Sequence, residues 1–248
     1  TGINIYNHLL EALIIKDADL YIYNQTLQNL IEMGCFPDGH FQITSDQYSE
    51  EIYMLLENLE VKRYQPVIFI QDELCHSINE INNHILMLDD NSKLKSTQGI
   101  IELIISSRKL FSEDVEKSIF NSCKDLEVLT KDNELMPLSK CYLSYEYTEN
   151  KEIEDLMEGF PQKSLSFVSP SYTSVSKYDS KEWKKTLKLL KCSDDHLSFI
   201  KKELLPSLDV LDENQIINAT KLIFRHQNRL EKELISLNYF PVLTKSGI

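Results

Sequence analysis

The stretch "QDELCHS" gathers acidic, thiol and imidazole side chains that could do chemistry. These are, in chain order, Asp72, Glu73, Cys75 and His76. A thiolate beside an imidazole can act as a nucleophile. Neighbouring residues of one helix or strand point apart, however, so the fold would have to bring these groups together. We expect a junction between a strand and a helix with a buried cysteine.

A hydrolase or nuclease site within residues 1–110 stays open as an alternative. It requires at least two of the four side chains above, or one of them with His84, to converge in one pocket. A second candidate, "PDGHF", contains Asp38 and His40, but a metal site needs more ligands at suitable spacing. We therefore expect a surface turn there, and we expect no metal in this segment.

Other signatures of catalysis are missing from the sequence. The six glycines do not form a phosphate-binding loop, so no ATP site is expected here. No G-x-S-x-G stretch is present. The acidic pairs Asp89–Asp90 and Asp194–Asp195 are expected in loops or helix caps.

Basic side chains gather near the C-terminus. The residues that could contact a partner are Lys184, Lys188, Lys191, Arg225 and Arg229. They could bind phosphate groups, which leaves a nucleic-acid-binding module as a second alternative, or they could form a solvated face. Trp183, at helical spacing from Leu187, is expected in the core.

The charge of the chain is unevenly distributed. The net charge is −13, yet residues 181–248 hold 12 Lys and Arg against 9 Asp and Glu. The acidic remainder argues against nonspecific binding of nucleic acid or anionic membranes. No apolar run approaches the roughly 20 residues of a membrane span, so no membrane contact is expected.

Cysteine usage and the chain ends bear on location and completeness. Five scattered cysteines without C-x-x-C fit a reducing cytoplasm. The chain begins at Thr1 and ends within a pattern, so we expect a piece of a longer protein.

Apolar periodicity predicts a mostly helical α+β fold. The expected division is a helical subdomain over 1–124, a hairpin with an extended linker over 125–179, and a helical unit over 180–248. One buried strand is expected at "PVIFI", residues 66–70. Helices are expected over 3–17, 20–34, 44–59, 78–88, 96–110, 112–123, 180–192, 193–205 and 212–237.

A β-hairpin is expected over about 126–143. "LEVLTK" is followed by Asn133, a residue type that tolerates positive φ in a tight turn. Pro137 then limits the returning strand to an edge or a short pairing. "FPVLTK" at 240–245 repeats the pattern with Gly247 at the turn, which makes the chain about one period of a larger array.

The stretch "LTKDNELMPLSKCYLSYEY" resembles a segment of large proteins related to sacsin and to the plant protein NO VEIN. The matching residues are Thr130, Asp132, Pro137, Ser139, Tyr142, Leu143, Ser144, Glu146 and Tyr147. "SPSY" and the helix "EWKKTLKLLKC" resemble the parts that follow in that family. Asn133 and Tyr145 depart from the usual Gly and Asp, and the resemblance covers only residues 120–248.

The resemblance implies an ATPase domain of the chaperone, gyrase and histidine-kinase type elsewhere in the full-length protein. ATP would bind there and not in this segment. The segment itself would be a noncatalytic scaffold that contacts other domains or protein partners. Bacterial relatives imply a role in defence against foreign DNA.

Overall fold

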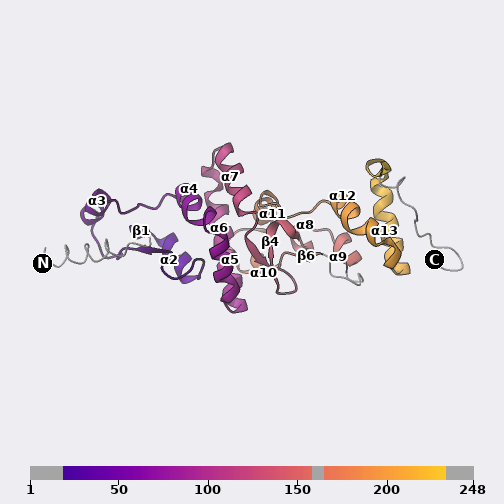
Figure 1. Cartoon of the computed structure of the whole chain (residues 1–248), viewed down its shortest axis with the longest axis horizontal. Helices are drawn as coiled ribbons and strands as arrows, with labels where there is room; N and C mark the ends of the chain where they lie inside the picture. Colours follow the sequence, from indigo (N-terminus) through magenta and orange to yellow (C-terminus); the bar gives the residue numbers. More distant parts are fainter. Residues whose placement is uncertain (1–18, 158–164, 233–248) are drawn as a thin grey trace. The chain divides into compact units, whose positions relative to one another are not determined.

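The computed structural model describes residues 19–157 and 165–232, which fall into two compact units (Figure 1). Unit 1 is residues 1–123 and unit 2 is residues 124–248. Both are mostly helical with short strands, which confirms the expected α+β class. The division into three parts stays a prediction.

Two expected features fall outside the described residues. They are the helix over 3–17 and the second hairpin at 240–245.

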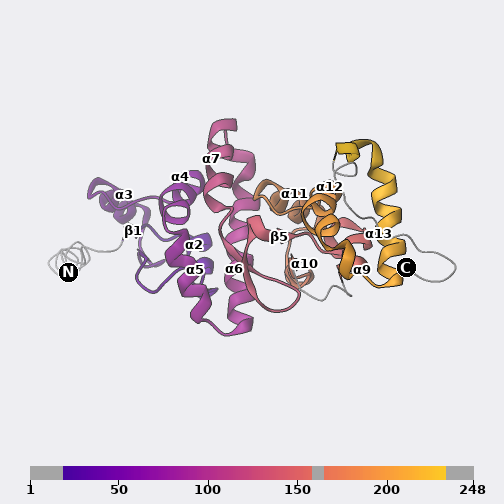
Figure 2. The ribbon, with the colours of Figure 1, turned by 45° about the vertical axis from the view of Figure 1, so that its right-hand side comes forward.

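Unit 1 holds a small sheet followed by helices. Its elements are β1 (Asp19–Tyr21), α2 (Gln25–Glu32), β2 (Phe41–Ile43), α3 (Glu50–Asn58), α4 (Pro66–Phe69), the π-helix η1 (Ile70–Cys75), α5 (Ile78–Met87), α6 (Asp90–Ser107), the short 3-10 helix η2 (Arg108–Leu110) and α7 (Glu113–Cys123). Helices α5 and α6 lie side by side (Figures 1 and 2). Ile100, Ile101 and Ile104 on α6 are fully buried, so this helix forms the centre of the unit 1 core.

Two predictions for unit 1 are wrong. The expected strand "PVIFI" is helical, because Pro66 occupies the first turn of α4, a position that suits proline, and the chain continues into η1. A short apolar run does not distinguish a buried strand from a buried helix. The helix expected from residue 20 begins at Gln25 instead, because Tyr21 is buried in the sheet.

Unit 2 begins with the predicted hairpin. Its elements are β3 (Glu127–Leu129), β4 (Leu135–Pro137), the 3-10 helix η3 (Leu138–Lys140), β5 (Cys141–Tyr142), α8 (Tyr145–Thr148), α9 (Glu152–Met157), β6 (Ser166–Phe167), α10 (Ser171–Val175), α11 (Ser180–Leu189), α12 (His196–Phe199), the π-helix η4 (Ile200–Leu204), the 3-10 helix η5 (Leu205–Val210), α13 (Glu213–His226) and the 3-10 helix η6 (Gln227–Arg229). Strands β3 and β4 pair antiparallel, and Asn133 has φ +61° at the turn. The hairpin and its turn residue are therefore confirmed.

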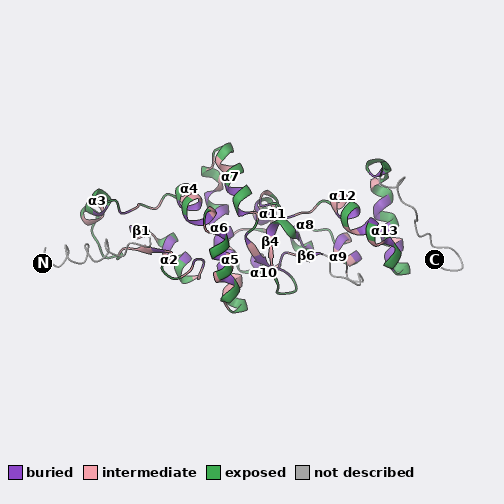
Figure 3. Ribbon diagram, in the orientation of Figure 1, coloured by how far each residue is buried: buried purple, intermediate pink, exposed green. Residues whose placement is uncertain are grey.

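The expected linker of unit 2 is not simply extended. Short helices α8, α9 and α10 occupy much of it. Each helix places a large side chain in the core, namely Tyr147, Leu156 and Tyr172. Helix α13 shows buried residues along one face and exposed residues along the other (Figure 3). Its N-terminus is capped by Asp212.

A shared pattern of backbone hydrogen bonds appears in both units, first in unit 1. There β1 is the central strand, with β2 parallel on one side and a parallel bridge to Lys62 on the other. Ile22 N donates to Lys62 O (2.8 Å), and Lys62 N donates to Leu20 O (3.0 Å). On the β2 side, Thr44 N donates to Tyr21 O (2.9 Å).

Unit 2 has the same arrangement, with an equivalent for each of these three backbone hydrogen bonds. Strand β5 is central, β6 pairs parallel on one side, and Ser193 bridges parallel on the other. Leu143 N donates to Ser193 O (2.8 Å), and Ser193 N donates to Cys141 O (2.9 Å). Val168 N donates to Tyr142 O (2.9 Å). Tyr142 and Ser193 thus occupy the positions that Tyr21 and Lys62 occupy in unit 1.

The helix before the bridging residue ends alike in the two units. After α3, Glu60 has φ +67° and Val61 N donates to Leu56 O (3.0 Å). After α11, Lys191 has φ +72° and Cys192 N donates to Leu187 O (3.0 Å). Positive φ outside glycine is uncommon, so its recurrence at the same place identifies a common design.

The next element is also common to both units. A single α-turn passes directly into a π-helix, as α4–η1 in unit 1 and as α12–η4 in unit 2. The two sequences, "FIQDEL" from Phe69 and "FIKKEL" from Phe199, share Phe, Ile, Glu and Leu. We call the central strand, its two parallel neighbours, the helix α3 or α11 and this α-to-π element the shared frame.

Candidate functional site

The chemical side chains of unit 1 do not converge. His76 Nδ1 lies 3.3 Å from the carbonyl oxygen of Asp72, within one helical turn. His84 Nε2 lies 3.1 Å from the carbonyl oxygen of Gly34. Cys75 Sγ faces Cys123, and Glu73 enters a separate buried cluster, so the convergence that a hydrolase or nuclease site required among these residues is not found.

Glu73 lies at the centre of that polar cluster. Tyr21 Oη donates to Glu73 Oε1 (2.6 Å), and Lys62 Nζ lies 3.6 Å from the same oxygen. His40 Nε2 lies 3.5 Å from Glu73 Oε2. Burial raises the pKa of the Glu73 carboxyl.

The turn expected at "PDGHF" is present, since His40 N donates to Pro37 O (3.1 Å) and Asp38 and Gly39 are exposed, but the side chain of His40 points inward. Its side chain is 11% exposed and its ring stacks on Phe36, with centroids 5.1 Å apart. No signal in the sequence links His40 to Glu73, because the two are far apart in the chain and meet only through the fold.

Two members of the Glu73 cluster have equivalents in unit 2. Glu203 is the frame equivalent of Glu73, and Tyr142 is the equivalent of Tyr21. Burial and, to a smaller degree, the charge of Glu203 raise the pKa of Tyr142. Tyrosine and glutamate therefore occupy the same two frame positions in both units, with a direct hydrogen bond in unit 1.

In unit 2, an aromatic stack joins three segments that the sequence singled out. Tyr172 of "SPSY" stacks on Trp183 of α11, with ring centroids 5.3 Å apart and planes 16° apart, and both are fully buried. Tyr172 Oη accepts a hydrogen bond from the Leu129 N–H of the hairpin (2.8 Å). Trp183 Nε1 donates to Ser176 Oγ (2.9 Å). The prediction of Trp183 in the core is confirmed.

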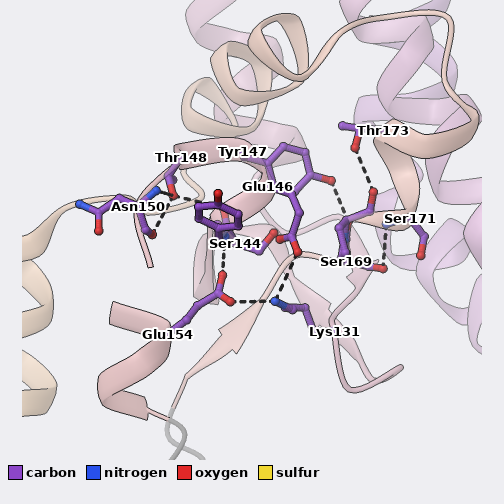
Figure 4. A network of polar contacts seen from close by, with 12 residues as sticks. Lys131, Ser144, Glu146, Tyr147, Thr148, Asn150, Glu154, Ser169, Ser171 and Thr173 are labelled. Carbon is purple, nitrogen blue, oxygen red and sulfur yellow. Dashed lines mark hydrogen bonds and ion pairs between the residues drawn. The ribbon is translucent and has the colours of Figure 1, made fainter. Parts of the chain in front are cut away.

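The "YLSYEY" phrase is attached to the same place. Tyr147 is buried, and its hydroxyl donates to the carbonyl oxygen of Ser169 (2.7 Å), as Figure 4 shows. Ser169 N in turn donates to Leu129 O in β3 (3.0 Å). Burial raises the pKa of Tyr147 well above its usual value, so its hydroxyl stays a donor.

Lys131, next to the hairpin turn, completes this network. Its ammonium lies 2.7 Å from Glu154 and 3.6 Å from Glu146, between the two carboxylates in Figure 4. Glu154 also accepts from Tyr145 N. Partial burial opposes its charge, yet the hydrogen bond and charge of Glu154 leave the pKa of Lys131 raised.

We call the contacts made by the hairpin, Tyr147, Tyr172 and Trp183 the hairpin node. It includes Thr130, Asp132, Pro137 and Tyr147 of the phrase that carries the family resemblance. Its tyrosine hydroxyls bind backbone groups of Leu129 and Ser169.

A groove lies beside the hairpin node and contains one of the predicted interaction residues. Its cavity volume is about 180 Å³, and its lining residues are Leu143, Thr148, Asn150, Ile153, Glu154, Phe167, Lys184, Asp194 and His196. The lining thus combines three apolar side chains with two carboxylates, a lysine, an imidazole and two uncharged polar residues. We call this cavity the Lys184 groove.

A second cavity of about 210 Å³ lies between α9 and α13. Glu152 and Asp155 line it from α9, while Lys221 and Arg225 line it from α13. Arg225 forms an ion pair with Glu152 across it. This cavity also combines both signs of charge.

The predicted basic residues do not form one surface. Lys184 lines its groove, and Lys188 pairs with Asp194 (2.9 Å). Arg225 belongs to the second cavity. Lys191 lies beyond the end of α11 and Arg229 lies in η6, where both are exposed.

The Lys188–Asp194 ion pair has a counterpart in unit 1. At the equivalent frame positions Arg63 pairs with Glu57, so the same bridge occurs with its charges exchanged. This recurrence assigns Lys188 to the frame, whereas Lys184 remains available to a partner.

Among the residues that the structure describes, no group of three or more His, Cys, Asp and Glu side chains could hold a metal ion. No helix in residues 19–157 or 165–232 is long and apolar enough to cross a membrane.

The chain was also compared with known proteins. No family model, no curated protein and no solved structure matches it.

Proposed function

We propose that the chain is a noncatalytic interaction scaffold built from tandem copies of the shared frame, and that it belongs to a large sacsin-like protein with an ATPase domain elsewhere. The observation that carries the scaffold role is the frame itself. It appears twice with the same hydrogen bonds. Within it, the candidate chemical residue Glu73 bonds to Tyr21, and the candidate interaction residue Lys188 pairs with Asp194.

The sequence supports a longer array of such units. The words "IIKD" at 14–17, "LTKD" at 129–132 and "LTKS" at 243–246 begin at spacings of 115 and 114 residues. Repeat proteins use stacked copies of one unit to present extended binding surfaces. Transmission of nucleotide-driven change through such an array, and defence against foreign DNA, remain part of the proposal through the resemblance alone.

The size of the Lys184 groove indicates the kind of partner. Its volume of about 180 Å³ is below the roughly 300–1,000 Å³ of small-molecule and cofactor sites. A space of this size accepts one large side chain. The mixture of apolar and charged lining residues fits an apolar anchor residue flanked by charges, as in a segment of a protein partner.

Comparison of the two frames supports a specific role for Lys184. Its frame equivalent in unit 1 is Tyr53, whose hydroxyl donates to the carbonyl oxygen of Ser45. The frame therefore does not require a lysine at this position. A residue that varies between copies is suited to recognising one partner.

A selection of random displayed peptides against the full chain tests this function. We expect enrichment of peptides with one apolar anchor and neighbouring charges. Lys184→Glu should weaken their binding at least tenfold, which corresponds to about 1.4 kcal/mol. Lys185→Glu is the matched control, because Lys185 is exposed on the same helix and does not line the groove.

Other outcomes would redirect or reject the proposal. Equal loss in both lysine variants would show that net charge alone drives binding. DNA or RNA binding that falls with salt and is lost in Lys184→Glu would favour the nucleic-acid module instead. We also propose a cytoplasmic location, because all five cysteines are free thiols in the structure.

A further inference from the structure

Cys75 and Cys123 form a close pair of thiols in unit 1. Their sulfur atoms are 3.7 Å apart, although 48 positions separate the residues in the chain. Cys75 is the last residue of η1 and Cys123 the last residue of α7. A disulfide has an S–S distance of about 2.05 Å, so bond formation requires the sulfurs to approach by less than 2 Å.

The two thiols differ in exposure. Cys75 is partly exposed, whereas Cys123 is fully buried. A small reagent in solution therefore reaches Cys75 first and finds Cys123 directly behind it. The hydrogen bond from Cys123 lowers the pKa of Cys75, while the same contact and burial raise the pKa of Cys123.

The other three cysteines lack this arrangement. Cys35, Cys141 and Cys192 are buried, and burial raises the pKa of each thiol, to about 12 for Cys141. A raised pKa and burial both reduce thiol reactivity.

The shared frame also does not require a cysteine at the position of Cys75. The π-helices η1 and η4 match through Leu74 and Leu204, so the frame equivalent of Cys75 is Leu205. An apolar residue therefore satisfies the packing at this position. Unit 1 carries a thiol where unit 2 does not.

We propose that Cys75 and Cys123 are a redox modification site that forms a disulfide on reaction with a small disulfide such as oxidised glutathione. The Cys75 thiolate attacks one sulfur of the reagent and releases one glutathione thiolate, leaving a mixed disulfide. Cys123 then loses its proton and attacks the Cys75 sulfur, which releases the second glutathione. The two protein thiols are oxidised and the reagent is reduced to two glutathione thiols.

The product would join the end of η1 covalently to the end of α7.

Peptide mapping of the native full chain after graded treatment with oxidised glutathione tests the proposal. Unreacted thiols are blocked before trypsin digestion. We expect the peptides 64–93 and 118–124 to be joined by one disulfide, with loss of two hydrogen atoms, while Cys35, Cys141 and Cys192 stay blocked as thiols. The joined peptides should disappear on reduction.

Variants separate the pair from the other thiols. Cys75→Ser and Cys123→Ser should each abolish the joined peptides, and Cys35→Ser should leave them unchanged. The wild-type map decides the question even where a serine variant fails to fold. A stable glutathione adduct on Cys75 without closure, a disulfide to another cysteine, or closure only after denaturation would overturn the proposal.

Discussion

Tyr147→Phe tests the hairpin node by removing one hydroxyl and leaving the ring in place. The side chain is 4% exposed, and its hydroxyl donates to the Ser169 carbonyl at 2.7 Å. The substitution deletes that hydrogen bond and leaves a carbonyl oxygen inside the unit with one partner fewer. Phenylalanine keeps the packing of the ring, so no cavity the size of a side chain is formed.

The expected loss follows from these contacts. A buried neutral hydrogen bond contributes about 1 kcal/mol, and an acceptor left without its donor adds to the cost. We expect unit 2 to lose about 1–2 kcal/mol in its free energy of unfolding, a factor of roughly 5–30 in the folded-to-unfolded ratio. Urea unfolding followed by Trp183 fluorescence measures this loss, because Trp183 is the only tryptophan and is buried at the node.

The same phrase supplies the control. Tyr145 is 38% exposed and lies two residues earlier, so Tyr145→Phe should change the unfolding free energy by less than about 0.5 kcal/mol. Equal effects of the two substitutions, or no effect of Tyr147→Phe, would refute the role of the node in stability.

Three further substitutions test other parts of the fold. Gly99→Ala places a Cβ 2.6 Å from Cys35 Sγ, so unit 1 should lose about 1–3 kcal/mol in urea unfolding followed by circular dichroism, and a neutral result would contradict this close packing. Asp212→Ala removes the capping box of α13 and should cost about 0.5–2 kcal/mol by the same measurement; an unchanged midpoint would contradict the cap. Burial raises the pKa of Glu73 above 4.5, so the native state holds this proton more tightly than the unfolded chain, and stability from this group falls as pH rises from 4.5 through the raised pKa. Glu73→Gln should therefore flatten the decrease in unfolding free energy over that window, and an unchanged slope would exclude Glu73 as its source.

Local sequence signals predicted the parts of the fold that depend on local chemistry. Asn133 marked the hairpin turn, because asparagine tolerates the positive φ that a tight turn requires. Trp183 followed from helical spacing. The strand at 66–70 failed because an apolar run of five residues has no period of its own.

The shared frame could not be predicted from the sequence pattern. Only "FIxxEL" recurs visibly, at Phe69 and Phe199, while the bridging residues Lys62 and Ser193 have nothing in common chemically. Their equivalence lies in backbone hydrogen bonds, which any residue except proline as a donor can make.

The candidate site shows the same limit. Lys184 and Lys188 were both predicted as interaction residues because helical spacing placed them on one face. Only the structure shows that Asp194 pairs with Lys188 and that Lys184 lines the groove. The Cys75–Cys123 pair was missed, since contacts between distant segments carry no spacing signal.

Binding of the selected peptides to the native chain and to its two lysine variants tests the interaction scaffold most directly. Affinity is measured by calorimetric titration at physiological salt. The Lys184 groove predicts affinity within about twofold of wild type for Lys185→Glu and at least tenfold weaker for Lys184→Glu. Failure of the chain to bind any selected peptide, or equal affinities of the two variants, would contradict it.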